Sequence, residues 1–157
     1  MIKNKKWVVF TKLDNDDSLS KTWIDEIQKF WVPITSVLGR PFSFVNFNNG
    51  LLYIKRNDED YLLDHKDRHN PFVNSIEKVS LVDRGGYKTC WKDTHNRILG
   101  HIYPNYVLRM EDSNTPMFLI NDQKFNLCNR DNKIESSKKT KKDYNYIKDN
   151  FGINIRE

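Results

Sequence analysis

The stretch FSFVNFNNGLLYIK, residues 42–55, decides the fold class of this chain. Large apolar side chains recur at every second or third position over residues 42–47, and residues 51–54 form a second apolar run. Asn49-Gly50 lies between the two runs, and this pair is typical of the tight turn of a β-hairpin. A polar segment at 57–60 and an apolar run at 61–63 follow. The sequence therefore predicts a three-stranded meander over residues 41–63, with a polar loop over 64–74.

Short apolar runs on both sides of this stretch predict more strands. One strand is expected within residues 2–13, around WVVF (7–10), and the polar segment DNDD (14–17) is expected to turn the chain. The remaining predicted strands are residues 79–82, 87–91, 98–108 and 117–120. Closely spaced short strands of this kind indicate an α+β protein with a small, mainly antiparallel β-sheet or an SH3-like barrel.

Two segments have the apolar spacing of an amphipathic helix. The first begins at Ser18 or Ser20, whose hydroxyl can accept a hydrogen bond from the first N–H groups of a helix, and ends before Pro33. Four apolar residues of this helix follow one another at a spacing of four: Leu19, Trp23, Ile27 and Trp31. Ile24 and Phe30 are expected to widen this apolar stripe. The second segment, residues 144–151, is predicted to form a short docking helix that ends at Gly152.

The length of 157 residues predicts one full-sized domain. Residues 1–129 are expected to form a globular α+β domain with a β-rich core, and residues 130–157 a basic linker followed by the short helix. No run approaches the roughly 18 consecutive apolar residues that a membrane helix needs. We therefore expect a cytoplasmic protein without a membrane partner.

Positive charge is concentrated in two parts of the chain. Lys and Arg total 26 against 21 Asp and Glu, a net charge of +5, and the excess lies in residues 78–109 and 130–157. In the first segment basic residues alternate with aromatic ones, which suits a nucleic-acid surface, because cations replace phosphate counterions and rings stack on bases. The predicted contacts are Arg84, Tyr87, Lys88, Trp91, Lys92 and Arg97, with Lys138, Lys139, Lys141 and Lys142 as a basic arm. The alternative is that the aromatic residues belong to the core and the charges keep it soluble.

Residues 78–110 resemble small KOW or SH3-like barrels, because alternating apolar residues, a Gly85-Gly86 turn and further apolar runs follow one another. The small, basic and aromatic chain is also similar in kind to early accessory proteins of T-even-type phages, of the MotB-like DNA-binding type. These resemblances imply a phage-encoded protein that modulates host transcription. A host transcription or nucleoid protein would then be a further partner.

Residues 64–82 resemble the core of HNH endonucleases, in which an Asp-His pair ends a strand and an Asn-Pro loop, a further Asn and a helix follow. Carried over, Asp64 would help to hold a divalent cation, His65 would activate the attacking water, and Asn74 would orient the loop. Lys78 stands where this family has a metal-binding Asn, and its charge would repel a cation. The resemblance therefore implies an HNH-like endonuclease or its inactive descendant.

The leading hypothesis is a non-enzymatic nucleic-acid-binding protein, with DNA favoured, weak sequence preference, and neither metal nor cofactor. The HNH-like endonuclease is the first alternative. The second is an inhibitor that docks on a host protein through the apolar stripe of the first helix, although such a stripe more often belongs to the core.

Overall fold

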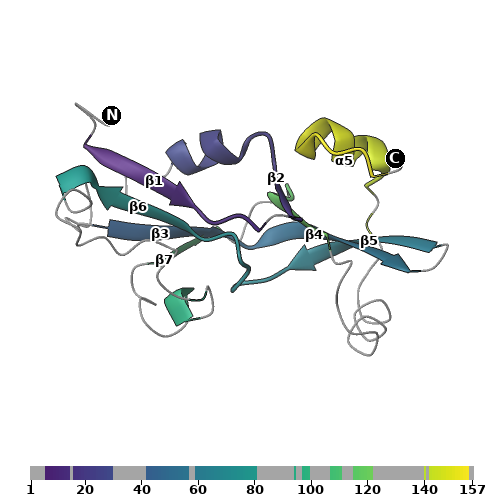
Figure 1. The fold of residues 1–157 in the computed structure, drawn as a ribbon, viewed down its shortest axis with the longest axis horizontal. Coiled ribbons are helices and arrows are strands. Elements are labelled where there is room, and N and C mark those ends of the chain that lie inside the picture. The colour runs from purple at the N-terminus through teal and green to yellow at the C-terminus, as the bar shows by residue number, and fades with distance from the viewer. Residues whose placement is uncertain are drawn as a thin grey trace. The chain divides into compact units, whose positions relative to one another are not determined.

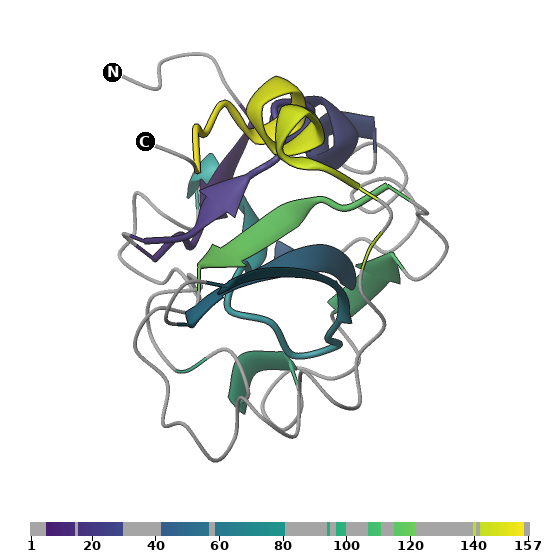
Figure 2. The same ribbon diagram turned by 90° about the vertical axis from the view of Figure 1, so that its right-hand side faces the viewer.

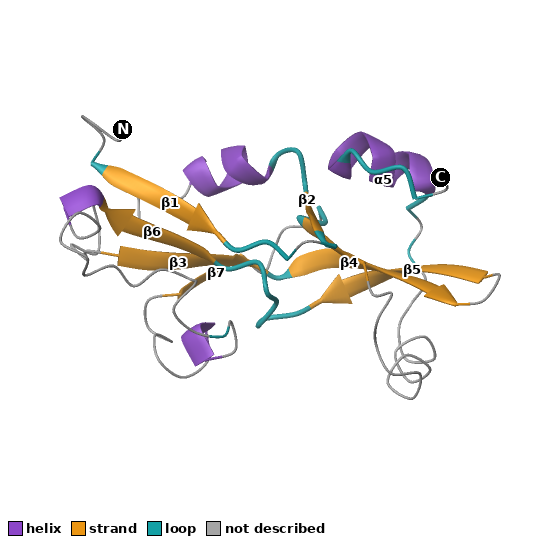
Figure 3. Cartoon of the chain, viewed as in Figure 1, coloured by secondary structure: helices purple, strands orange, loops and turns teal. Residues whose placement is uncertain are grey.

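The chain forms two compact units, each built from three separate segments. The computed structural model describes residues 6–14, 16–29, 42–56, 59–80, 94, 97–99, 107–110, 115–121, 140 and 142–155. Unit 1 consists of Met1–Leu13, Ile24–Asn48 and Arg68–Glu111, and unit 2 of Asp14–Trp23, Asn49–Asp67 and Asp112–Glu157. Each unit contains one four-stranded sheet, drawn as orange arrows in Figure 3.

The sheet of unit 1 has the strand order β1-β6-β3-β7 (Figure 1). Its strands are β1 (Trp7–Thr11), β3 (Phe42–Phe47), β6 (Asn74–Lys78) and β7 (Val107–Met110). β6 is antiparallel to β1 and β3, whereas β7 is parallel to β3. Phe44 and Val45 are both fully buried. Since neighbouring residues of a strand point to opposite faces, both faces of β3 are covered.

Buried asparagines satisfy backbone groups within unit 1. Asn74 donates from Nδ2 to the carbonyl of Val45 (3.0 Å), and its Oδ1 accepts from the hydroxyl of Thr11 (2.8 Å). Asn70 donates in the same way to the carbonyl of Phe47 (2.7 Å). A buried polar group is tolerated when it is hydrogen-bonded, so these asparagines are structural members of the unit 1 core.

The sheet of unit 2 has the strand order β2-β8-β4-β5. Its strands are β2 (Ser18–Leu19), β4 (Asn49–Arg56), β5 (Glu59–Lys66) and β8 (Phe118–Asn121). β4 and β5 form a long antiparallel pair, β8 is parallel to β4, and β2 is antiparallel to β8. In both sheets, therefore, a strand from late in the chain pairs in parallel with an earlier one: β7 with β3 and β8 with β4.

Helix α5 (Tyr144–Phe151) covers one face of the unit 2 sheet. Its Ile147 and Phe151 are buried against Leu51, Leu62 and Leu119 of the strands. In Figure 2 the yellow helix lies above the green ribbon of β8. The other face of the sheet has its own apolar cluster around Leu52, Ile54 and Leu63.

Both ends of α5 carry capping groups. The carboxylate of Asp143 accepts a hydrogen bond from the N–H of Tyr146 (2.9 Å) at the start. At the end, Gly152 adopts a left-handed conformation with φ of 75°, and its N–H donates to the carbonyl of Lys148. The prediction of a short helix ended by Gly152 is confirmed.

The predicted meander over residues 41–63 is wrong. β3 pairs with β6 and β7, whereas β4 pairs with β5 and β8, so β3 and β4 belong to different sheets. Asn49 and Gly50 are the first residues of β4 and do not form a hairpin turn. The three strands exist, but the chain changes sheets after β3.

Other predicted boundaries also need correction. Residues 64–66 continue β5 and residues 74–78 form β6, so the predicted polar loop is only residues 67–73. Residues 79–80 and 98–99 are helical where strands were expected, while residues 107–110 form the strand β7. The strands predicted around residues 7–10 and 117–120 are confirmed as β1 and β8. Residues 81–93 lie outside the described part of the chain.

The first predicted helix is present over residues 23–29, but it starts later than expected because residues 18–19 form β2. The hydroxyl of Ser20 does accept a hydrogen bond from the backbone N–H of Thr22 (3.2 Å). Trp23 and Ile27 are each 1% exposed, whereas Ile24 is 57% exposed and does not widen the buried stripe. Phe30, Trp31 and Pro33 lie outside the described residues. Trp23 and Ile27 are each buried, so their side chains are not exposed as a docking face.

The chain combines helices with two mainly antiparallel sheets, as the sequence predicts. Each sheet has two different edge strands in its order, so neither closes into a barrel within the described residues. Across those same residues, no helix is long and apolar enough to span a membrane.

Candidate functional site

Three aspartates lie in the short connection between β1 and β2. The backbone N–H of Asp17 donates to the carbonyl of Asp14 (3.3 Å), which closes a turn. The side chains of Asp14 and Asp16 are exposed to solvent. We call Asp14, Asp16 and Asp17 the acidic turn.

The acidic turn is joined to the end of β8. Oδ1 of Asp17 accepts a hydrogen bond from the backbone N–H of Asn121 at 2.9 Å, although the two residues are 104 positions apart. β2 follows the turn and pairs with β8, with Ser18 opposite Leu119. These contacts fix the acidic turn beside Asn121 in unit 2.

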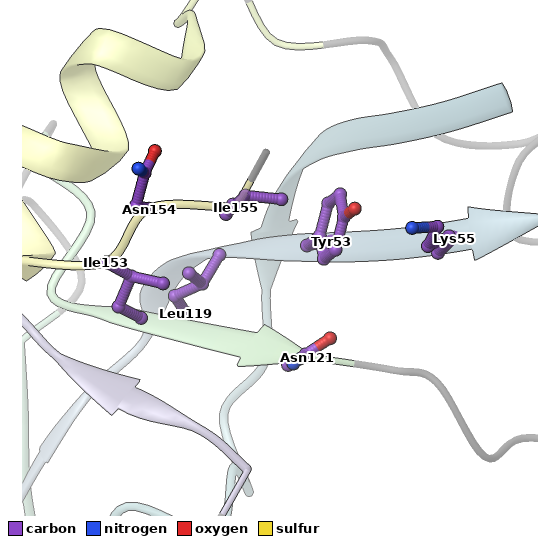
Figure 4. A pocket seen from close by; sticks show the side chains of 7 residues that line it. All are labelled: Tyr53, Lys55, Leu119, Asn121, Ile153, Asn154 and Ile155. Carbon is purple, nitrogen blue, oxygen red and sulfur yellow. The ribbon is translucent and has the colours of Figure 1, made fainter. Parts of the chain in front are cut away.

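A pocket of about 240 Å³ lies at the same end of the sheet. Tyr53 of β4 and Asn121 of β8 are register partners and share this pocket. Figure 4 shows the two strands on one side and the segment after α5 on the other. The lining residues are Tyr53, Lys55, Leu119, Asn121, Ile153, Asn154 and Ile155. We call this the Tyr53 pocket.

The Tyr53 side chain is held by Asp60. Burial, followed by the charge of Asp60, a hydrogen bond to Asp60 and the neighbouring Tyr144, raises the pKa of Tyr53 to about 12. The hydroxyl of Tyr144 also donates to Oδ2 of Asp60 (3.4 Å). Tyr53 is therefore neutral at physiological pH, which excludes it as a general base, and its ring orientation is set from outside the pocket.

Asn121 contributes an unused hydrogen-bond acceptor. Its Oδ1 is buried and has no hydrogen-bond partner among the described residues. Leaving such a group unpaired costs about 1–3 kcal/mol.

Asp64 and His65 line a second pocket, of about 270 Å³, near the start of β4. The ring of His65 meets the ring of Phe118 edge-on, with centroids 6.2 Å apart, and its Nε2 is 4.0 Å from Oδ2 of Asp67. The ammonium of Lys142 lies 4.0 Å from Oδ1 of Asp64. The two residues are neighbours on β5, as the HNH resemblance requires.

Asn74 belongs to unit 1, and both ends of its side-chain amide are used inside that unit. The HNH resemblance also needs a helix after Asn74, whereas residues 74–78 form the strand β6 with Lys78 at its end. Among the described residues, no three His, Cys, Asp or Glu side chains come together in a way that would hold a metal ion. In the described residues, the structure therefore does not reproduce the HNH arrangement around Asp64, His65 and Asn74.

Most of the predicted nucleic-acid contacts lie outside the described residues: Arg84, Tyr87, Lys88, Trp91, Lys92, Lys138, Lys139 and Lys141. Arg97 is described and exposed, in the helical segment 97–99. Lys142 is partly buried, and its ammonium lies 5.3 Å from the ring centroid of Tyr146 as well as near Asp64. Lys142 thus contacts its own unit.

Sequence reasoning missed both parts of this site. It interpreted the acidic turn only as a change of chain direction, because a cluster of Asp and Asn residues between two apolar runs is typical of a turn. The Tyr53 pocket left no local signal, because its lining comes from three distant segments of the chain.

Comparison with known proteins gives one match. Residues 2–134 match the family model described as "Putative rhamnosyl transferase". No curated protein and no solved structure matches the chain. The family match overturns the predicted nucleic-acid-binding function and its two alternatives, because it points to glycosyl transfer.

Proposed function

Since this chain belongs to that rhamnosyl transferase family, we propose that it transfers a rhamnosyl group from a nucleoside diphosphate donor to an acceptor hydroxyl. The family match over residues 2–134 carries the proposal. The matched range includes the acidic turn and the strands β4 and β8 that line the Tyr53 pocket. A cytoplasmic location, expected from the sequence, is part of the same proposal.

The reaction exchanges one bond at the anomeric carbon for another. The oxygen of the acceptor hydroxyl forms a bond to C1 of the sugar, and the bond from C1 to the phosphate oxygen breaks. The electron pair of the broken bond leaves on the nucleoside diphosphate, and the acceptor proton is released to solvent. Charge therefore develops on the diphosphate, and the protein has to stabilise it.

The acidic turn supports this chemistry through a divalent cation. Mg²⁺ in proteins is usually held by one or two carboxylates together with substrate phosphates. The exposed carboxylates of Asp14 and Asp16 are oxygen donors of this kind, and the hydrogen bond from Asn121 to Asp17 fixes the turn beside the pocket. When bound, the cation would neutralise the leaving diphosphate.

Hydrolysis of the donor tests this proposal without knowledge of the acceptor. The full chain is incubated with a nucleoside diphosphate rhamnose and Mg²⁺ or Mn²⁺, and the release of nucleoside diphosphate is measured, since water can replace the acceptor. We expect metal-dependent release, abolished by the double substitution Asp14→Asn with Asp16→Asn.

Asp149→Asn is the matched control, because Asp149 is an exposed aspartate of α5 outside the acidic turn. It should leave the release unchanged. Absence of release with either metal, or equal release by the double variant, would refute the proposal.

A further inference from the structure

We propose that the Tyr53 pocket is a binding site for the ring of a 6-deoxyhexose, and that residues 153–155, which follow the family-matched range, complete it. This inference rests on the proposed function for its ligand class. It adds where the sugar binds and which residues recognise the missing hydroxyl at C6.

The size of the pocket suits one sugar ring. Sites for drug-sized ligands usually measure about 300–1,000 Å³, whereas the Tyr53 pocket measures about 240 Å³. A whole nucleoside diphosphate sugar would not fit in it. A single pyranose ring would, with the remainder of the donor extending from the pocket.

One wall of the pocket is apolar. Leu119 is buried, and Ile153 and Ile155 are partly buried against the same cluster. In Figure 4 the side chain of Ile153 points toward Leu119 and that of Ile155 toward Tyr53, while Asn154 between them points the other way. A methyl group loses little on entering such a wall, but a hydroxyl would lose its hydrogen bonds to water.

The other wall carries polar groups. Asn121 is partly exposed and lines this wall. Its side-chain amide can form a hydrogen bond with a ring hydroxyl. Lys55 is exposed at the edge of the pocket and supplies a cationic donor. A 6-deoxyhexose has both surfaces that these walls require: several ring hydroxyls and one methyl group.

The pocket is also arranged in advance of binding. Tyr53 is 4% exposed and its hydroxyl is occupied by Asp60, so its ring is held in one position where it lines the pocket. The hydrogen bond between Asp17 and the backbone of Asn121 joins the pocket to the acidic turn. A sugar in the pocket would have its diphosphate on the side of the carboxylates that are proposed to bind its cation.

Residues 153–155 are held in place by α5. Gly152 ends the helix in a left-handed conformation, and the following residues return to the sheet cluster formed by Leu51, Tyr53 and Leu119. The family match ends at residue 134, so this wall lies outside the matched range. It determines the sugar preference in this proposal.

The test uses L-rhamnose and L-mannose, which differ only by the hydroxyl at C6. Amide NMR spectra of the full chain are recorded during titration with each sugar. With L-rhamnose we expect shifts confined to the pocket lining, at residues 53–55, 119–121 and 153–155. L-mannose should bind about tenfold more weakly, because its extra hydroxyl faces the apolar wall.

Two variants test the polar and the apolar wall of the pocket independently. Asn121→Ala should weaken binding of both sugars about three- to tenfold, because it removes one hydrogen-bond acceptor. Ile153→Ser should reduce the preference for L-rhamnose over L-mannose while the folded spectrum is kept. His65→Ala, in the second pocket, is the control and should change neither affinity.

Each outcome decides the proposal. Shifts elsewhere, equal affinity for the two sugars, or no binding would overturn it, even if donor hydrolysis is observed. Binding of L-rhamnose in the pocket by a protein that hydrolyses no donor would refute the proposed transfer reaction and support the pocket.

Discussion

Gly50 of β4 and Phe118 of β8 are register partners on parallel strands, and the ring of Phe118 occupies the space where a side chain at position 50 would begin. His65 lies opposite Gly50 on the other side of β4 and meets the same ring edge-on. Glycine is required here because of this close approach, although the sequence suggested a turn. The three residues connect β5, β4 and β8.

Gly50→Ala should therefore destabilise the protein. The added methyl group overlaps the Phe118 ring, and overpacking of this kind costs about 1–3 kcal/mol. Urea denaturation followed by circular dichroism measures the change. Phe118→Leu in the same chain removes the obstructing ring atoms, so the double variant should be more stable than the sum of the two single losses predicts. Strictly additive losses would contradict the proposed contact.

Tyr53 should be among the last tyrosines to ionise. Its raised pKa of about 12 reflects burial first and the charge of Asp60 second. Absorbance near 295 nm, recorded from pH 8 to 13, should show a late component that Tyr53→Phe removes. Tyr146, whose pKa burial also raises, should still titrate late in that variant. An unchanged titration curve for Tyr53→Phe would contradict the environment described for Tyr53.

The same pKa shift gives the stability a pH dependence of known sign. The folded state favours the neutral form of Tyr53, so its contribution is complete below the ordinary tyrosine pKa of about 10. It is lost as the pH rises from about 10 toward about 12. The wild type should lose more unfolding free energy over that window than Tyr53→Phe, measured by urea denaturation at each pH. Equal slopes would rule out this linkage.

Asp143 starts α5 by accepting the N–H of Tyr146, so Asp143→Ala should lower the unfolding free energy by about 1 kcal/mol. Asp143→Ser keeps an acceptor at this position and should recover most of the loss. Thermal unfolding of the three proteins measures the difference. Because α5 holds residues 153–155 against the sheet, Asp143→Ala should also weaken L-rhamnose binding in proportion to helix fraying. A serine variant as unstable as the alanine variant would argue against capping.

The elements that sequence reasoning predicted correctly are those with local causes. Residues 144–151 carry their apolar spacing, their Asp143 cap and their terminal Gly152 within ten positions. β1 and β8 are short apolar runs with polar neighbours, and their identity as strands follows from that pattern alone.

The errors come from pairings between distant residues. Asn49-Gly50 has the local signature of a hairpin, but β3 pairs with β7 and β4 with β8, and such parallel pairing has no local signature. The candidate site was not predicted for the same reason, because the hydrogen bond between Asp17 and Asn121 joins residues 104 positions apart. Charge and aromatic spacing were visible in the sequence, but they did not show which residues share a pocket.

Substitutions of Asn74 test whether this residue has a structural role in unit 1 or the catalytic role that the HNH resemblance implied. Asn74→Asp replaces its N–H donor with a carboxylate oxygen facing the carbonyl of Val45, in a fully buried position. Ionisation of the introduced carboxyl is disfavoured by burial, so the loss of stability should be large at pH 7 and smaller near pH 4, where a protonated carboxyl can donate. Urea denaturation at the two pH values, each compared with the wild type, measures this. Asn74→Ala is the control: it should lose about 1–3 kcal/mol at both pH values, because it leaves the Val45 carbonyl unpaired without adding charge. A loss for Asn74→Asp that does not depend on pH would show that the position is open to water and would contradict its place in the core of unit 1.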